Sequence, residues 1–112
     1  MNLEEFLSKI NEEPARVSFA DTLDAIEANY TFKPTAFKNG DTYNEAGQNN
    51  GSCKIFAFAQ KHQLTAEQTL YCFGTYYRND VLNNPDGDDH QNIRNFIKYG
   101  WDGIEFEGEA LV

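Results

Sequence analysis

Cys53, His90 and Asp102 have the types and the order along the chain that nucleophilic catalysis requires. In papain-like hydrolases a cysteine thiol comes first, and a later histidine removes its proton while a further polar side chain orients the imidazole. Cys53 follows Ser52 at an expected helix start, where the helix dipole and neighbouring Lys54 would stabilise a thiolate. One hypothesis is therefore a small thiol-dependent hydrolase or transferase that uses Cys53. The alternative is that Cys53 is a small apolar residue of the core.

The loop before Ser52 is rich in asparagine and glycine, and it leads into the same expected helix start. Unpaired amides at a helix N-terminus bind anions, and glycine lets a ligand approach the backbone closely. The spacing of Gly47, Gly51 and Lys54 is not that of a Walker A motif, in which Gly-Lys-Ser/Thr follows four intervening residues. The composition of this segment is compatible with two roles. Either the loop binds a small anion, or its side chains form hydrogen bonds within the loop itself. The residues assigned to this candidate ligand site are Asn49, Asn50, Gly51, Ser52, Lys54, His90 and Arg94.

The aspartates Asp86, Asp88 and Asp89 lie in a turn-rich loop that invites comparison with a calcium site. An EF-hand loop has glycine at position 6, and aligning Gly87 there puts Leu82 at position 1, where a carboxylate is required. The carboxylates are instead expected to cap the next helix and remain solvated. The chain has two histidines and no cysteine spacing typical of a zinc site. The sequence therefore predicts no metal and no cofactor.

Three runs carry a family resemblance: GSCKIFAFA at residues 51–59, FGTYYRND at residues 73–80 and DHQNIRNF at residues 89–96. They resemble the HopJ family, which is named for a type III secreted effector of plant-pathogenic bacteria. The resemblance covers almost the whole chain. It implies a bacterial, effector-like protein that is secreted into a host cell, and it supplies no catalytic residue to carry over.

The amino-acid composition limits the classes of partner that the protein is expected to bind. The chain of 112 residues has the length of one domain, and its 40% hydrophobic and 14% aromatic residues can fill one core. Nine basic and 18 acidic residues give a net charge of −9, and the basic residues are spread along the chain. This charge repels phosphate backbones and anionic lipids, so neither nucleic acid nor membrane is an expected partner.

Cysteine content and hydropathy indicate a compartment. Cys53 and Cys72 both lie in apolar, helix-like contexts, which favours free thiols in a reducing environment. No apolar run approaches a membrane span, and the N-terminus lacks the pattern of a signal peptide. The expected location is the cytoplasm, or a host cell if the protein is a type III effector.

The first part of the chain predicts two helices and a hairpin. Asn2 is placed to cap a helix over residues 2–13, which Pro14 ends, and Ser18 with Asp21 forms a capping box for a second, antiparallel helix. Asn39-Gly40 predicts a hairpin with a type I′ turn, because both residues tolerate the positive φ that this turn requires. The strands are expected over residues 30–38 and 41–44, and the polar loop over residues 45–51.

The second part predicts three helices and a strand. Ser52 is the expected N-cap of an almost wholly apolar, central helix, and Thr65 with Gln68 opens a helix that continues to Tyr77. Gly74 in that helix suggests a close contact with another helix. The last helix is expected to begin after a cap by Asp88 with Gln91, or by Asp89 alone, to carry Ile93, Phe96 and Ile97, and to end at Gly100. Trp101 is expected to fold back on this helix, and residues 104–107 are expected to pair with the hairpin.

These patterns predict a single α+β domain with about five helices and a small antiparallel sheet built on the hairpin at Asn39-Gly40. The leading functional interpretation is a non-enzymatic binding or protein-interaction module. Its candidate face joins residues 45–54 to residues 88–94, and its partner is an unknown protein or a small anionic ligand. Four aromatic residues are expected either to form a contact surface or to complete the core: Tyr76, Tyr77, Tyr99 and Trp101.

Overall fold

The computed structural model describes residues 2–112. Its elements are α1 (Leu3–Glu12), the 3-10 turn η1 (Pro14–Arg16), α2 (Phe19–Asn29), β1 (Phe37–Asn39), β2 (Thr42–Asn44), α3 (Asn50–Lys61), α4 (Ala66–Tyr71), the π-helical turn η2 (Tyr76–Val81), α5 (Gln91–Tyr99), the 3-10 turn η3 (Gly100–Gly103) and β3 (Ile104–Phe106).

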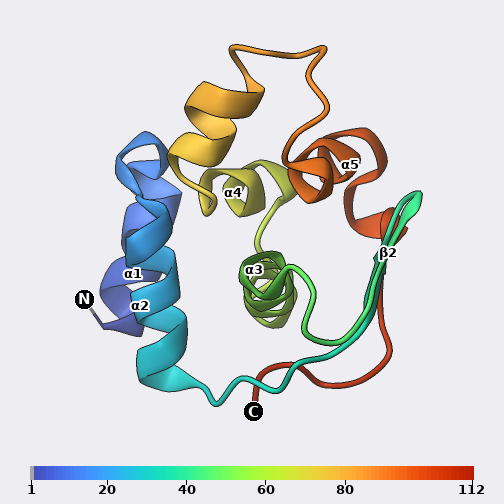
Figure 1. Cartoon of the computed structure of the whole chain (residues 1–112). Helices are drawn as coiled ribbons and strands as arrows, with labels where there is room; N and C mark the ends of the chain where they lie inside the picture. Colours follow the sequence, from blue (N-terminus) through green and yellow to red (C-terminus); the bar gives the residue numbers. More distant parts are fainter. Residues whose placement is uncertain (1) are drawn as a thin grey trace.

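Helix α3 is the centre of the fold. Figure 1 shows it end-on, with α1 and α2 on one side and the strands on the other. Phe56 contacts rings from the sheet, α5 and the segment after α4, with centroids 6.1 Å from Phe37, 5.0 Å from Phe96 and 5.5 Å from Phe73. Phe58 lies 5.7 Å from Phe6 of α1. Residues 53 and 55–59 of α3 are buried. The prediction that this helix is the central and most enclosed one is confirmed.

Local capping signals placed three helices correctly. The Asn2 side chain accepts a hydrogen bond from the Glu5 amide at 2.8 Å and begins α1. The capping boxes that begin α2, from Ser18, and α4, from Thr65, are both present in full. Each box satisfies two backbone amides that a helix N-terminus leaves unbonded, so its effect depends on residues close in sequence.

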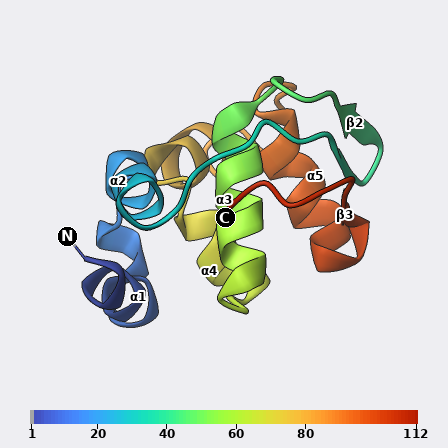
Figure 2. The same ribbon diagram turned by 90° about the horizontal axis from the view of Figure 1, so that it is seen from below.

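The three strands form an antiparallel sheet in the order β2-β1-β3. Phe37 of β1 lies opposite Asn44 of β2 and Phe106 of β3, so the predicted pairing of the C-terminal strand with the hairpin is confirmed. Figure 2 shows the end of the chain passing alongside α3. There Leu111 forms an isolated bridge with Phe32.

The hairpin at Asn39-Gly40 is present, but the first strand is shorter than residues 30–38. Pro34 has no amide hydrogen to donate, and the amides of Thr31 and Lys33 instead bond to the C-terminal residues Val112 and Ala110. Asn39 pairs with Thr42, so the two loop residues are Gly40 and Asp41. Only Gly40 of these two has a positive φ, which fits a type II′ turn with glycine first.

The helix expected from Thr65 to Tyr77 is interrupted. α4 ends at Tyr71, and Gly74 adopts a φ of +63° before the chain enters η2. A Cβ at Gly74 would lie 2.6 Å from the Phe19 amide nitrogen, so the close approach predicted at this glycine is confirmed. It is a contact with the start of α2, and the backbone can make it only where no side chain intervenes.

The boundaries of α3 and α5 differ from the predicted ones. α3 begins two residues before Ser52, with Asn49 at its N-cap, and α5 has His90 rather than an aspartate at its N-cap. Ile93 and Phe96 of α5 are buried, whereas Ile97 on the outer face of this helix is 49% exposed. Trp101 folds back as predicted, with its ring centroid 5.0 Å from that of Phe96.

Candidate functional site

A cleft of about 580 Å³ lies where the N-termini of α3 and α5 meet the start of α2 and η2. It brings together the two segments that the sequence analysis assigned to one face, residues 45–54 and residues 88–94. Its walls are formed by Phe19, Thr42, Asn49, Gly51, Ser52, Phe73, Tyr76, His90, Gln91, Asn92 and Ile93.

The N-terminus of α3 reaches the cleft without a side-chain cap. Asn49 adopts the left-handed conformation, with a φ of 51°, and its side chain makes no capping hydrogen bond. The first amide that bonds back along the chain at this end is that of Cys53, which donates to the Asn49 carbonyl at 3.0 Å. The amides of residues 50–52 therefore have no hydrogen-bond acceptor within α3.

The N-terminus of α5 has the same arrangement. His90 has a φ of 49° and makes no side-chain capping bond, and the first backbone bond of the helix runs from Arg94 to the His90 carbonyl at 3.1 Å. The amides of residues 91–93 are thus unpaired within α5. The cleft is lined by two helix N-termini, each of which carries about half a positive charge from its aligned peptide dipoles.

An aromatic wall faces these amides. The Tyr76 ring centroid is 5.0 Å from that of Phe19, at an interplanar angle of 78°, and 5.2 Å from that of His90, at 41°. Tyr76 is 41% exposed, so its ring is available to a ligand. The cleft therefore combines backbone donors with apolar ring surface.

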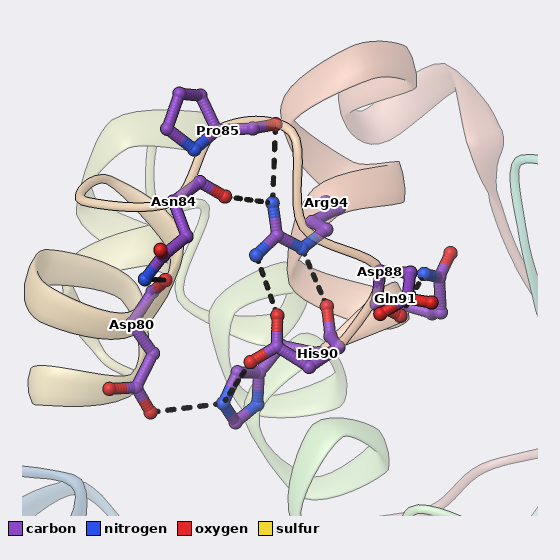
Figure 3. Close-up of polar contacts among 8 residues, drawn as sticks. Asp80, Asn84, Pro85, Asp88, His90, Gln91 and Arg94 are labelled. Atoms are coloured by element: carbon purple, nitrogen blue, oxygen red, sulfur yellow. Dashed lines mark hydrogen bonds and ion pairs between the residues drawn. The ribbon is translucent and has the colours of Figure 1, made fainter.

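Arg94 fastens the loop that leads into α5. Its guanidinium donates to the Asp89 carboxylate and to the Asp89 carbonyl, both at 2.6 Å, and to the Asn84 carbonyl at 2.8 Å (Figure 3). The hydrogen bond from Arg94 holds the pKa of the Asp89 carboxyl below its usual value. Arg94 does not line the cleft, so its predicted role as a ligand-binding residue is replaced by one in holding the loop.

His90 is also held by carboxylates. Its Nε2 lies 3.1 Å from Asp80 Oδ2 and 3.8 Å from Asp89 Oδ2, as Figure 3 shows. The Asp88 carbonyl accepts a hydrogen bond from the Gln91 side chain. The aspartates therefore anchor neighbouring side chains, and neither the Asp88 nor the Asp89 cap predicted for α5 is formed.

A cluster of buried asparagines supports the cleft from behind. Asn92 Oδ1 accepts from Asn39 at 3.0 Å and from Asn44 at 3.1 Å, while its Nδ2 donates to Asn44 Oδ1 at 3.0 Å. Asn49 also donates to Asn44 Oδ1, at 2.7 Å. These bonds tie β1 and β2 to the starts of both helices, so they fix how the two N-termini lie in relation to each other.

Some predicted site residues lie elsewhere. Asn50 begins α3 but is not in the cleft wall, and Lys54 points toward α2, with its Nζ 3.5 Å from Glu27 Oε1 and 4.9 Å from the centre of the Phe32 ring. Lys54 therefore adds no charge to the cleft. Of the predicted residues, Asn49, Gly51, Ser52 and His90 do line it.

The geometry does not support a catalytic role for Cys53. The side chain is 1% exposed and donates to the Thr35 carbonyl at 3.4 Å. Burial raises the pKa of the Cys53 thiol, which opposes the thiolate that catalysis would need. The carboxylates beside His90 are Asp80 and Asp89, not Asp102. The structure thus does not assemble the proposed Cys53, His90 and Asp102 triad.

Native Cys53 is expected to react with iodoacetamide near pH 6 more slowly than free cysteine, because its raised pKa and its burial both reduce the accessible thiolate. Peptide mass spectrometry after timed labelling measures this rate. Cys72, which is fully buried and has a pKa raised to about 12, serves as an internal reference for an unreactive thiol. Labelling of Cys53 faster than that of free cysteine would contradict the structural role.

Phe19, Phe73 and Asn92 were not identified as site residues from the sequence, whereas Tyr76 was named there as a candidate for an aromatic contact surface. Phe19 and Phe73 look like core residues, and both line the cleft. Over residues 2–112, no three His, Cys, Asp or Glu side chains are arranged to hold a metal ion. No helix in the same range is both long enough and apolar enough to cross a membrane.

Comparisons with known proteins agree over nearly the whole chain. The family model described as HopJ type III effector protein matches residues 3–111. A solved structure described as the crystal structure of unknown function protein VPA0580 is similar to this chain, with 53% sequence identity and a TM-score of 0.98. The match covers 100% of this chain and 93% of that one. No protein with a curated description matches.

Proposed function

Because the chain belongs to the HopJ type III effector protein family, for which the family name specifies no chemistry, we propose a function from the cleft itself. The protein is a non-enzymatic binding module, and the cleft between α3 and α5 holds the anionic group of its ligand. The observation that carries this proposal is the convergence of two helix N-termini without side-chain caps on one cleft.

Two amide arrays favour an anion for a simple physical reason. A helix N-terminus leaves amides unbonded, and most helices satisfy one of them with a Ser, Thr, Asp or Asn side chain. α2 and α4 do this with complete capping boxes, whereas α3 and α5 do not. An anion in the cleft would accept hydrogen bonds from both arrays and would be stabilised by both dipoles.

The charge and shape of the cleft favour a carboxylate on an aromatic or apolar body. No lysine or arginine lines the cleft, and the protein carries a net charge of −9, which disfavours a multiply charged phosphate. A carboxylate needs only one compensating charge, which the two dipoles together supply. The rings of Phe19, Phe73 and Tyr76 offer the apolar surface for the rest of the ligand.

The carboxylate has two chemical sources that share this mode of binding. It is either a small organic acid or the C-terminal carboxylate of a partner protein with an aromatic last residue. The small acid is the occupant that we propose. The family is described as a type III effector protein. We also propose on this ground that the protein is secreted into a host cell, where the cleft would meet its ligand.

Gly51→Ala is expected to abolish carboxylate binding while the fold is retained. Gly51 lines the cleft, and a Cβ there would lie 3.1 Å from Phe19 Cζ, in the space between the ring and the α3 amides. Gly51 lies in α3, and alanine favours a helix over glycine by roughly 1 kcal/mol. This gain offsets the cost of the close contact with Phe19, so the fold is expected to be retained. Loss of two charge-assisted hydrogen bonds, each worth at least about 1.5 kcal/mol, corresponds to an affinity at least about 100-fold lower.

Thermal unfolding with a panel of aromatic monocarboxylates, inorganic phosphate, and peptides with free or amidated C-termini measures this effect. A ligand at about 100 times its Kd stabilises the wild type by about 2.7 kcal/mol. Asn50→Ala is the matched control, because Asn50 is the first residue of the same helix but does not line the cleft. Equal stabilisation of wild type and Gly51→Ala by every carboxylate, or of the wild type by none, would refute the proposed site.

A further inference from the structure

A second concave surface lies between the end of η2 and the outer face of α5. It is a groove of about 430 Å³, and its apolar lining includes Val81, Leu82, Pro85 and Ile97. Leu82 and Ile97 are each 49% exposed and line the same groove. Large side chains that share an exposed apolar surface indicate an interaction site more strongly than isolated ones do.

Two exposed aspartates flank one residue of this groove. Gly87 lines the groove, and Asp86 and Asp88 are its neighbours in sequence. The charged side chains of the lining itself are those of Arg94 and Lys98. Over residues 2–112, neither carboxylate takes part in an ion pair, whereas Asp89 is paired with Arg94. The charge of Arg94 is thus already balanced, and the two aspartates beside Gly87 are not compensated.

The one other cation of the groove is turned toward a ring. Lys98 lines the groove, and its Nζ lies 5.1 Å from the centre of the Tyr99 ring. A lysine in this arrangement contributes its methylene stem to an apolar surface while the ammonium interacts with the aromatic face. The groove therefore offers a floor of aliphatic groups beside two uncompensated aspartates, on a protein whose net charge is −9.

We propose that this groove binds a basic amphipathic helix of a partner protein. The apolar face of that helix lies on Leu82 and Ile97, and its lysine or arginine side chains meet Asp86 and Asp88. A basic partner follows from charge complementarity, because attraction between oppositely charged surfaces selects the partner and accelerates its association. This site does not depend on the carboxylate cleft, and neither Leu82 nor Ile97 lines that cleft.

The probe is a synthetic helix of about 14 residues, stapled because an unconstrained peptide of that length is marginally helical in water. It carries leucines on one face and lysines beside them. A second peptide replaces the lysines with glutamates and keeps the leucines. Calorimetry measures the affinity of each peptide, and amide chemical shifts of the isotopically labelled protein locate the site.

The lysine peptide is expected to bind and to shift the amides of Leu82, Ile97 and Lys98, and the glutamate peptide is expected not to bind. Leu82→Ser combined with Ile97→Ser should lower the affinity for the lysine peptide at least about tenfold, because two apolar contacts are lost. Asp86→Asn with Asp88→Asn should weaken it about threefold to fivefold at low salt.

Glu4→Gln with Glu5→Gln is the control, since it makes the same change of charge at exposed residues of α1, which do not line the groove. Circular dichroism establishes that each variant is folded. The proposal is overturned if the lysine peptide does not bind, or if it binds the serine variant as tightly as the wild type. It is also overturned if Glu4→Gln with Glu5→Gln lowers the affinity for the lysine peptide as much as Asp86→Asn with Asp88→Asn does. Binding at the carboxylate cleft instead of the groove would also overturn it, and Gly51→Ala distinguishes that case.

Discussion

Gly74→Ala is expected to lower the free energy of unfolding by about 3 kcal/mol. About 1 kcal/mol comes from forcing alanine to adopt the φ of +63° that Gly74 has. The rest comes from a clash, because the new Cβ would lie 2.6 Å from the Phe19 amide nitrogen and 3.1 Å from the Ser18 carbonyl carbon. These are backbone atoms at the start of α2, so they cannot move aside as a flexible side chain would.

Gly47→Ala is the control for this prediction. Gly47 also has a positive φ, of +93°, but a Cβ there would meet nothing within 4 Å. It is expected to cost only the conformational part, about 1 kcal/mol. Urea unfolding of both variants, followed by circular dichroism, gives the two free energies. Equal losses in the two variants would show that the approach of Gly74 to α2 is not a determinant of stability.

Asn92→Ala is expected to cost about 3 kcal/mol, because it leaves buried polar groups without partners. The Asn92 amide accepts from Asn39 and Asn44 and donates to Asn44, and the two partners are 0% and 1% exposed. No water replaces these bonds unless the cluster opens. Asn39 already has one buried oxygen without a partner, so the cluster has little capacity to adapt.

Asn95→Ala, on the same helix, is the control for the asparagine cluster. Asn95 makes one side-chain hydrogen bond, to Thr42 Oγ1 at 2.6 Å, in a partly buried position. Its loss should cost about 1 kcal/mol. Denaturant unfolding again measures both variants. A loss of less than about 1 kcal/mol for Asn92→Ala would show that the buried cluster contributes little to stability.

Features that depend on near neighbours in sequence were predictable. The caps at Asn2, Ser18 and Thr65 each join residues three positions apart, so the residue types alone specify them. The hairpin was also predicted from Asn39-Gly40, but the predicted type I′ turn is wrong, since Asn39 lies in β1 and the two loop residues are Gly40 and Asp41. The buried character of α3 followed from its composition. The family resemblance is confirmed by the match over residues 3–111.

Features that depend on distant residues were not predictable. Ser52 has a side chain typical of an N-cap, yet α3 begins two residues earlier, since Asn49 in the left-handed conformation donates to Asn44. His90 displaces the aspartates as the cap of α5 in a similar way. Asparagine and histidine adopt this conformation more readily than most residues, but only the tertiary contacts show which of several asparagines does so.

Only part of the candidate site was predicted, because the site also joins residues that are distant in sequence. The sequence indicated that residues near Gly51 and residues near His90 share a face, because both lie at helix starts rich in polar residues. It named Tyr76 as a candidate contact residue, but it did not indicate Phe19 or Phe73, since these two have the spacing of core residues. Only the turn at Gly74, which brings η2 back against α2, places these rings at the cleft.

The most direct test of the carboxylate cleft is a titration of isotopically labelled protein with benzoate, and with benzamide as the neutral analogue. Benzoate is predicted to cause the largest amide shifts at Gly51, Ser52, Asn92 and Ile93, because their N–H groups lie at the two helix starts. Benzamide has nearly the same shape without the charge, and it is predicted to leave these amides unshifted. Equal shifts with both compounds, or shifts confined to other parts of the protein, would contradict an anion site formed by α3 and α5.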